Sequence, residues 1–388
     1  MFPDLAEQLR AREQQGLRRF RQVVESPQAS HITIDGHDYL TFSSNDYLGL
    51  ANHPDLIHSA CEGAQHYGVG AGASHLINGH SAAHHILEET LAQFTGFPRA
   101  LLFSTGYMAN IGVVTALVGR EDTIFADKLN HASLNDAALL SRAKFIRYSH
   151  LDLATLEQRL ADSNARRKLV ISDAVFSMEG DIAPIKQLIA LCEKYHALLL
   201  LDDAHGFGVL GQQGRGSLFL PDNTSVHSSN IVYMATLGKA AGVFGAFVAA
   251  QADVVETLIQ SARSYIYTTA TPPLLSHALL TSLKLIELEE WRRDALLQNI
   301  AQLKNDLLSS SWKLLPSSTP IQPLLIGESH EAVRVSQTLR ERGILVPAIR
   351  PPTVPQGKAR LRISLSTTHQ PQDILRLTQA LNELALDS

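Results

Sequence analysis

The sequence predicts an α/β protein, with a large domain built on a mostly parallel, helix-covered sheet and a smaller C-terminal α+β domain. From about residue 54 onward, apolar runs of four to six residues alternate with helical stretches. Such runs between helices indicate strands that are buried on both faces. Beyond about residue 285 the pattern changes to a long helix and strands of alternating polarity. The chain of 388 residues is 45% apolar and 18% charged, which excludes a long disordered protein.

The first 45 residues predict a helix and a small hairpin, not a domain of their own. Residues 4–22 have helix-forming composition with a loose leucine stripe. Residues 31–42 then alternate apolar and polar side chains around Asp35-Gly36, which is a typical dipeptide of a tight hairpin turn.

The large domain is predicted to span residues 46–285. Its predicted strands are 100–103, 123–126, 168–173, 197–203, 230–236 and 244–250. A helix over 185–195 carries one apolar face and is followed directly by the run ALLLL. Strand, helix and strand in this order form a βαβ unit, and the repetition of the pattern gives the α/β class.

The small domain is predicted to span residues 286–388. It begins with a long helix over 292–310, followed by a strand at 321–327 and a helix that Gly343 closes. In ARLRISLS, residues 359–366, leucine and isoleucine alternate with arginine and serine. Strict alternation predicts a sheet with one buried face and one face in water.

Charge and cysteine content narrow the functional classes. With 33 Lys plus Arg against 38 Asp plus Glu, the net charge is −5, which argues against a generally basic nucleic-acid binder. No window approaches the roughly 18 apolar residues of a membrane span, and no apolar signal core is found. Cys61 and Cys192 are far apart and form no CxxC spacing, so neither a disulfide framework nor a zinc site is expected. We therefore expect a cytoplasmic enzyme with no nucleic-acid or membrane partner.

Polar side chains gather where the predicted strands end. Asp202 and His205 follow the run ALLLL, Lys239 lies three residues after the next strand, and Ser177 lies just beyond another. Residues 104–110 resemble a loop that turns into a helix N-terminus, whose free amides form an anion site. Ligands of open α/β sheets bind outside the carboxyl ends of the strands. These ends therefore offer a carboxylate, an imidazole, a primary amine and an anion cradle.

Pyridoxal 5′-phosphate (PLP) requires this set of groups. It needs a lysine for a Schiff base, a carboxylate for its ring nitrogen and donors for its phosphate. Apolar neighbours disfavour an ammonium, which helps a lysine to act as nucleophile and base. The structural alternatives are a solvated loop carboxylate at Asp202, a turn cap at His205 and a surface lysine at Lys239.

Three other patterns in the sequence favour structural roles. The glycine-rich GVGAG at 68–72 follows a helical stretch and not a strand, which argues against a dinucleotide loop. His80, His84 and Glu88 share a helical face, but a solvated face is the favoured interpretation and no metal is expected. Arg360 and Arg362 are read as the polar side of a strand.

Eight motifs occur in an order that is typical of one family. They are FSSNDYLGL (42–50), GASHLINGH (72–80), LFSTGYMAN (102–110), DKLNHASL (127–134), VFSMEGDIAP (175–184), LDDAHGFGVLGQQGRGS (201–217), TLGK (236–239) and RPPTVPQGKARLRISLSTTH (350–369). Over nearly its whole length the chain resembles the α-oxoamine synthases, a branch of the fold-type-I PLP enzymes. The resemblance implies PLP as cofactor and a homodimer with the active site at the subunit interface.

The resemblance also assigns site residues. The implied catalytic residues are Lys239, His131, Asp202 and His205; cofactor contacts come from Gly106, Tyr107, His131, Ser177, Asp202, His205, Thr236 and Lys239; substrate contacts come from Arg19, Asn45, His131, Arg350 and Thr353. Lys239 would form the Schiff base, Asp202 would pair with the ring nitrogen, and His131 would stack on the ring. His205 and Ser177 would bond the ring hydroxyl region.

The remaining roles concern phosphate and substrate. The amides of Gly106 and Tyr107 and the hydroxyl of Thr236 would hold the phosphate. Arg350 would receive the amino-acid carboxylate, as a bidentate pair, with Thr353 close by in the acyl site. Arg19 fits best as the N-terminal substrate arginine, and Arg18 is the alternative.

Two positions depart from the family pattern. Many members have serine before the lysine where this chain has Gly238, and arginine where it has His75. The segment 264–269 is the implied contact to the phosphate of the neighbouring subunit.

The implied reaction is a decarboxylating condensation of L-alanine with a pimeloyl thioester in biotin biosynthesis. The pimeloyl group would be carried on coenzyme A or on acyl carrier protein. The alternative within the family is a glycine-using member of the 2-amino-3-ketobutyrate CoA ligase or 5-aminolevulinate synthase type. A catalytically silent binding subunit is disfavoured because Lys239 is present. A nicotinamide dehydrogenase is disfavoured because no glycine fingerprint follows the first strand.

Overall fold

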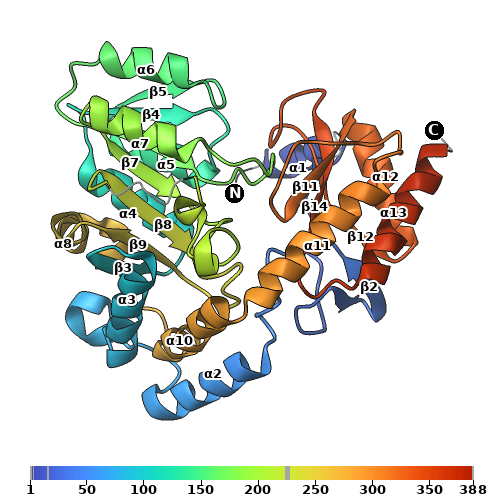
Figure 1. Ribbon diagram of the computed structural model, residues 1–388, viewed down its shortest axis with the longest axis horizontal. Helices are drawn as coiled ribbons and strands as arrows, with labels where there is room; N and C mark the ends of the chain where they lie inside the picture. Colours follow the sequence, from blue (N-terminus) through green and yellow to red (C-terminus); the bar gives the residue numbers. More distant parts are fainter. Residues whose placement is uncertain (1, 3, 15–16, 223–227, 387–388) are drawn as a thin grey trace.

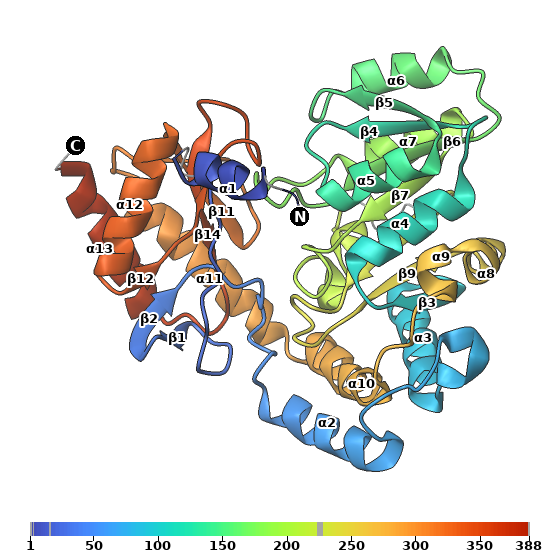
Figure 2. The ribbon, with the colours of Figure 1, turned by 180° about the vertical axis from the view of Figure 1, so that it is seen from behind.

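The structure, a computed structural model, describes residues 2, 4–14, 17–222 and 228–386. Figures 1 and 2 show two lobes, of which one holds the largest sheet and the other holds the C-terminal strands and helices. Helix α11 (Glu290–Asp306) runs from the first lobe into the second. Within the described residues, no helix is both long and apolar enough to cross a membrane.

The large sheet has seven strands in the order β3-β9-β8-β7-β6-β4-β5. Their bounds are β3 (Arg99–Phe103), β4 (Thr123–Asp127), β5 (Lys144–Tyr148), β6 (Lys168–Asp173), β7 (Leu198–Asp202), β8 (Ile231–Thr236) and β9 (Ala246–Ala250). The strands from β5 through β4, β6, β7 and β8 pair in parallel, whereas β9 is antiparallel to both β8 and β3. The predicted strands and the mostly parallel sheet are confirmed.

Helices cover both faces of this sheet. On one face lie α4 (Gly106–Leu117), α5 (Ala132–Ser141), α8 (Ala252–Ser261) and α9 (Arg263–Ile266), and on the other α3 (Ala82–Thr95), α6 (Leu153–Ala161) and α7 (Ile185–Lys194), with α2 (Pro54–Tyr67) and α10 (Pro273–Leu288) packed beyond α3. Ile124 and Ala126 of β4 enter one apolar core and Phe125 enters the other. This double burial explains why the strands appear as unbroken apolar runs.

The second lobe contains a four-stranded sheet and a three-stranded sheet. The first has the order β10-β11-β14-β13 and the second β1-β2-β12, with bounds β10 (Lys313–Leu314), β11 (Ile321–Gly327), β14 (Ala359–Ser364), β13 (Ala348–Ile349), β1 (His31–Ile34), β2 (His37–Thr41) and β12 (Ile344–Leu345). Helices α11, α12 (Ser329–Glu341) and α13 (Pro371–Leu386) pack in this lobe, and α1 (Leu5–Gln14) lies beside β11 (Figure 2). The π turn η1 (His75–Gly79) and the 3-10 turns η2 (Gln212–Gly214) and η3 (Ser217–Phe219) belong to the first lobe.

The N-terminal hairpin is confirmed. Asp35 and Gly36 both have positive φ angles, of 50° and 71°, as a tight two-residue turn requires. Strand β2 also pairs in parallel with β12, which joins the hairpin to the C-terminal part. The division at residues 46 and 286 stays a prediction.

Two expectations of local structure are corrected. The helix predicted over 4–22 is α1 (Leu5–Gln14), while residues 17–22 are irregular and 15–16 lie outside the described residues. Helix α1 has no buried residue, so its leucine stripe has no core to pack against.

The expected wet face of β14 is also wrong, because all six residues of this strand are buried. Arg360 and Arg362, on the polar face, are only 3% and 6% exposed. The Arg360 guanidinium donates to the carbonyl of Met178 (3.0 Å) and pairs with Glu179 (3.1 Å). The first lobe therefore covers this face and satisfies its charges.

Candidate active site

The end of β7 holds a buried carboxylate, Asp202, in a fixed orientation. Its Oδ2 accepts a hydrogen bond from Asn110 Nδ2 of α4 (2.7 Å), and its Oδ1 accepts one from the Ala204 amide (3.0 Å). Asn110 Nδ2 also donates to the Ser133 hydroxyl of α5 (2.9 Å). Asp202 is 3% exposed, so these neutral donors hold its charge without cancelling it.

Lys239 follows β8 and meets the imidazole of His205. Lys239 Nζ lies 2.8 Å from His205 Nε2, and His205 Nδ1 lies 2.7 Å from the Tyr47 hydroxyl. Because Tyr47 donates its own proton to Asn45 Oδ1 (3.1 Å), its oxygen is left to accept from His205 Nδ1. The network therefore assigns a neutral His205 whose Nε2 accepts from the lysine.

Burial shifts both groups toward their neutral forms. It lowers the pKa of Lys239 to about 8, and the nearby charge of Asp202 opposes this shift only in part. Burial, followed by the charge of Lys239, also lowers the pKa of His205 well below its ordinary value. A substantial fraction of neutral amine at moderately alkaline pH suits a nucleophile or a general base.

His131 forms the cap of helix α5. Its backbone N–H donates to Asp173 Oδ2 (2.6 Å), and its Nδ1 lies 2.7 Å from the Ser133 hydroxyl. The residue is exposed. These contacts fix the ring by its edge and leave it accessible to a planar ligand.

Gly106, Thr236 and Gly238 lie close together around the start of α4. A β-carbon built on Gly106 would lie 4.0 Å from the Thr236 β-carbon, and one built on Gly238 would lie 3.8 Å from Thr236 Oγ1. Thr105 caps the helix by accepting from the Met108 amide (3.1 Å). Free amides at a helix start, next to a hydroxyl, form an anion site.

Tyr107, the next residue of α4, is 43% exposed. Its hydroxyl donates to the carboxylate of Asp136. This contact fixes the side chain outside the helix start and leaves the phosphate role to its backbone amide.

Strand β14 brings Arg362 to the same region. Its Nε donates to the Ser177 carbonyl (2.6 Å) and its Nη1 to the Ser364 hydroxyl (2.7 Å). Nη1 and Nη2 also reach Asn45 Oδ1 at 3.3 and 3.2 Å. The Tyr47 hydroxyl is a further hydrogen-bond partner of this guanidinium. The partners of Arg362 named here are therefore neutral oxygens, which a ligand carboxylate can replace or share.

The sequence-predicted arginines come from two other segments of the chain. Arg350 and Thr353 belong to the segment between β13 and β14, where the Thr353 amide donates to the Arg350 carbonyl (3.0 Å). Arg19 is exposed in the irregular segment after α1. Arg18 pairs with Glu13 (2.8 Å), so Arg19 is the better candidate of the two for contacting a substrate.

Four residues of this site were not assigned roles from the sequence: Tyr47, Asn110, Asp173 and Arg362. Tyr47 and Asn110 lie inside the motifs 42–50 and 102–110, which was a usable signal. Asp173 ends a predicted strand, next to Asp202 in register. Arg362 gave no local signal, because its position in an alternating strand is typical of a solvated side chain.

Comparison with known proteins defines the broad class of enzyme to which the chain belongs. Residues 37–381 match the family described as aminotransferase class I and II, which covers most of the chain. A lysine-to-alanine variant of a serine palmitoyltransferase from S. paucimobilis, solved with a bound PLP–myriocin aldimine, has a TM-score of 0.91 at 28% identity; the match covers 98% of this chain and 96% of that one. The chain is a fold-type-I PLP-dependent transferase.

Closer relatives define the particular family. The 8-amino-7-oxononanoate synthase of Nitrosomonas eutropha is 67% identical over 385 residues, covering 99% of this chain and all of that protein. The enzyme of the same name from Nitrosospira multiformis is also 67% identical, covering 99% and 96%. The solved 8-amino-7-oxononanoate synthase of Francisella tularensis is 32% identical with a TM-score of 0.78, covering 89% and 97%. The chain belongs to the 8-amino-7-oxononanoate synthase family.

The residues present fit PLP. The site combines an amine whose pKa is about 8, a buried carboxylate and a helix start beside a threonine hydroxyl. This is the set of groups that the aldehyde, ring nitrogen and phosphate of PLP require.

Proposed function

We propose that this chain catalyses the decarboxylating condensation of L-alanine with a pimeloyl thioester, giving 8-amino-7-oxononanoate, CO2 and the free thiol. The observation that carries the proposal is Lys239 Nζ, 2.8 Å from a neutral His205 and close to the buried Asp202. The identity of 67% to synthases of this name supports the same reaction.

The roles of the cofactor-binding residues are proposed as follows. Lys239 would hold the aldehyde carbon of PLP, Asp202 the ring nitrogen, and His205 with Ser177 the ring hydroxyl side. His131 would stack on the ring, and Gly106, Tyr107 and Thr236 would hold the phosphate. When bound, PLP supplies an electron-withdrawing ring next to the Cα of the amino acid.

Proton transfer is assigned to Lys239. The amine of Lys239, with its pKa near 8, accepts the Cα proton of alanine. His205 Nε2, 2.8 Å away, accepts a hydrogen bond from the lysine and orients it. Tyr47 fixes the His205 ring from its other nitrogen (2.7 Å).

The alanine carboxylate is assigned to Arg362. Its guanidinium is buried and bonds the neutral side-chain oxygen of Asn45 only weakly (3.2 and 3.3 Å), and the charged carboxylate of alanine would replace that oxygen. The sequence assigned this role to Arg350, which stays the alternative. Thr353 would contact the acyl chain, and Arg19, or else Arg18, would bind substrate from the N-terminal segment.

We also propose a cytoplasmic homodimer. Both cysteines are free, which fits a reducing compartment. Tyr267 and Thr269 are exposed in the segment 264–269, which would contact the phosphate of the partner subunit. Ser264 Oγ donates to the Met108 carbonyl of α4 (2.7 Å), which ties this segment to the helix at the anion site.

Thiol release tests the proposal. Purified PLP-loaded protein is incubated with alanine or glycine and with pimeloyl, acetyl or succinyl thioesters, on coenzyme A and, for pimeloyl, on acyl carrier protein. We expect the highest kcat/KM for alanine with a pimeloyl thioester. The carrier of the pimeloyl group, coenzyme A or acyl carrier protein, is identified as the one that gives the higher kcat/KM. A preference for glycine with acetyl- or succinyl-CoA would instead establish the glycine-using alternative.

A further inference from the structure

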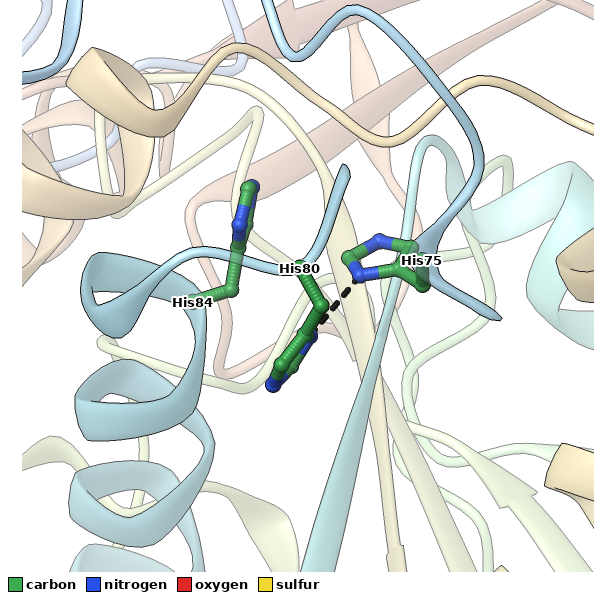
Figure 3. Close-up of side chains that lie close together, drawn as sticks. All are labelled: His75, His80 and His84. Carbon is green, nitrogen blue, oxygen red and sulfur yellow. Dashed lines mark hydrogen bonds between the residues drawn. The ribbon is translucent and has the colours of Figure 1, made fainter. Parts of the chain in front are cut away.

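A second group of titratable side chains lies outside the catalytic site, where η1 meets helix α3. His75 Nδ1 and His80 Nδ1 are 2.9 Å apart, and Figure 3 shows the two rings facing each other across this bond. The His75 ring stacks on Tyr265, with ring centres 5.0 Å apart and planes at 12°. Stacking and hydrogen bonding together fix the ring of His80 from one side.

Both ring nitrogens of His84 form hydrogen bonds to backbone groups. Its Nδ1 accepts from the Ser81 amide (3.1 Å), as part of the cap of α3, and its Nε2 lies 2.8 Å from the Thr271 carbonyl. Both nitrogens are therefore occupied, although the ring lies beside His80 in Figure 3. The sequence grouped His84 with His80 and Glu88, but the geometry replaces it with His85.

His80, His85 and Glu88 have ligand atoms available. One atom from each lies within 4.8 Å of the others. His80 Nε2 is 4.0 Å from Glu88 Oε2, while Glu88 Oε1 accepts from the Leu102 amide (2.9 Å). The three residues line a cavity of about 410 Å³, so ligand atoms and solvent share one space.

We propose that His80, His85 and Glu88 form a binding site for a divalent transition metal ion, with zinc as the best match. Two imidazole nitrogens and one carboxylate oxygen are a zinc ligand set. His75 Nδ1 would accept a hydrogen bond from the Nδ1–H of His80, which is the outer hydrogen bond that orients a metal-binding histidine.

The three ligand atoms lie farther apart than a bound zinc ion requires, and one side chain can move to close the gap. Tetrahedral zinc with bonds of about 2.1 Å requires ligand atoms roughly 3.4 Å apart, so the set must contract. The side chain of His85 is 63% exposed, lies 3.4 Å from Glu89 and has its ring centre 5.8 Å from that of His80, so it can rotate inward at little cost. Water from the cavity, or Glu89, would complete the coordination.

Metal titration of the PLP-loaded, untagged protein tests this site. We expect one Zn²⁺ per chain by calorimetry, and a tetrahedral Co²⁺ absorbance spectrum on substitution. His85→Ala and Glu88→Gln should each weaken Zn²⁺ binding by about 10- to 100-fold or more. Saturating Zn²⁺ should raise Tm by about 2–4 °C in the native chain but not in the His85→Ala variant.

The matched control is His58→Ala, in the exposed His58–Glu62 pair of α2 (3.3 Å). It should leave Zn²⁺ affinity and stoichiometry unchanged. Because His85 is exposed, its replacement by alanine cannot be confused with unfolding of a core position. Absence of a stoichiometric Zn²⁺ site, or a site that survives both His85→Ala and Glu88→Gln, would overturn the proposal.

Discussion

Two strands bring a charged side chain to the candidate active site, and the two charges are held in different ways. The C-terminal end of β7, with Asp202, is called the first edge, and the part of β14 that carries Arg362 is called the second edge. At the end of β7 in the large sheet, Asp202 is held by Asn110 and Ala204 of the same lobe. On β14 of the small sheet, Arg362 is held by the Ser177 carbonyl and by Asn45, far away in sequence. All the hydrogen-bond donors named for Asp202 come from its own lobe. Arg362, in contrast, is buried because the first lobe covers its strand.

This difference separates chemistry from substrate binding. The groups that change protonation, Lys239 and His205, belong to the large lobe and are desolvated within it. The cation assigned to the substrate carboxylate reaches them from the small lobe. The contrast predicts that changes at the first edge reduce kcat, and that changes at the second edge mainly raise KM for alanine.

The largest effect is expected at Asp202. Asp202→Asn removes a buried charge while keeping the shape, and we expect kcat to fall by about 10²- to 10³-fold with PLP still bound. Steady-state kinetics and the PLP content of the variant measure this. Asp203→Asn is the control, because Asp203 bonds Ser217 (2.7 Å to its amide) and Tyr233 (2.8 Å) and should affect stability more than kcat. A kcat within tenfold of the native value would contradict the role of Asp202.

A smaller loss is expected at the second edge. Arg362→Lys keeps the charge but loses the fork of N–H groups, so we expect kcat/KM for alanine to fall by roughly 10- to 150-fold, mostly through KM. Arg350→Gln is measured beside it and should cost less. If Arg350→Gln proved the more damaging change, the carboxylate would belong to Arg350 and the comparison would fail.

The contact between the two edges depends on the loop after β6. His150 bridges Asp127 (3.1 Å) and Asp181 (2.9 Å), and so ties this loop to β4. Burial opposes the charge of His150, but hydrogen bonds and charges from both carboxylates raise its pKa to about 10. His150→Gln should cost about 1–3 kcal/mol of unfolding free energy at pH 7, discounted for partial exposure.

The sign of the pH dependence follows from the raised pKa. The unfolded chain loses this proton near pH 6.5 and the folded chain near 10, so the stabilisation is full below 6.5 and disappears above 10. Thermal melts of native chain and variant at fixed concentration should therefore differ at pH 7 and converge above pH 10. A gap in Tm independent of pH would show that His150 acts through packing alone.

The smallest effect is expected at the anion site. Gly238 has room for a side chain, because the one atom of the described residues within 4 Å of a β-carbon there is Thr236 Oγ1, at 3.8 Å. Gly238→Ser should lower the dissociation constant of PLP by about two- to tenfold, as one added hydrogen bond. Gly238→Ala, which adds the carbon without the hydroxyl, should leave it unchanged; equal gains in both variants would exclude a phosphate hydrogen bond.

The sequence predicted the large sheet well where strands are buried on both faces, because such strands are continuous apolar runs. It missed β5, whose sequence KFIRY contains two charged residues and is not an apolar run. Among the described strands β5 pairs with β4 alone and forms an exposed edge of the sheet, where charged side chains are common. It also misread β14, since alternation is the same whether the polar face meets water or another lobe.

The residues of the candidate site also fall into those that the sequence predicted and those that it did not. Asp202, His205 and Lys239 come together because parallel strands end at one edge, which a sequence can predict. The roles of Arg362 and His85 depend on contacts between segments distant in the chain or on side-chain rotamers. Periodicity does not encode either of these.

The central claim is that Lys239 carries the cofactor. Borohydride reduction of the PLP-loaded protein, followed by peptide mapping, should find one pyridoxyl group per chain, on the peptide containing Lys239 and on its Nζ. A pyridoxyl group on any other lysine, or unchanged labelling in the Lys239→Ala variant, would contradict the account.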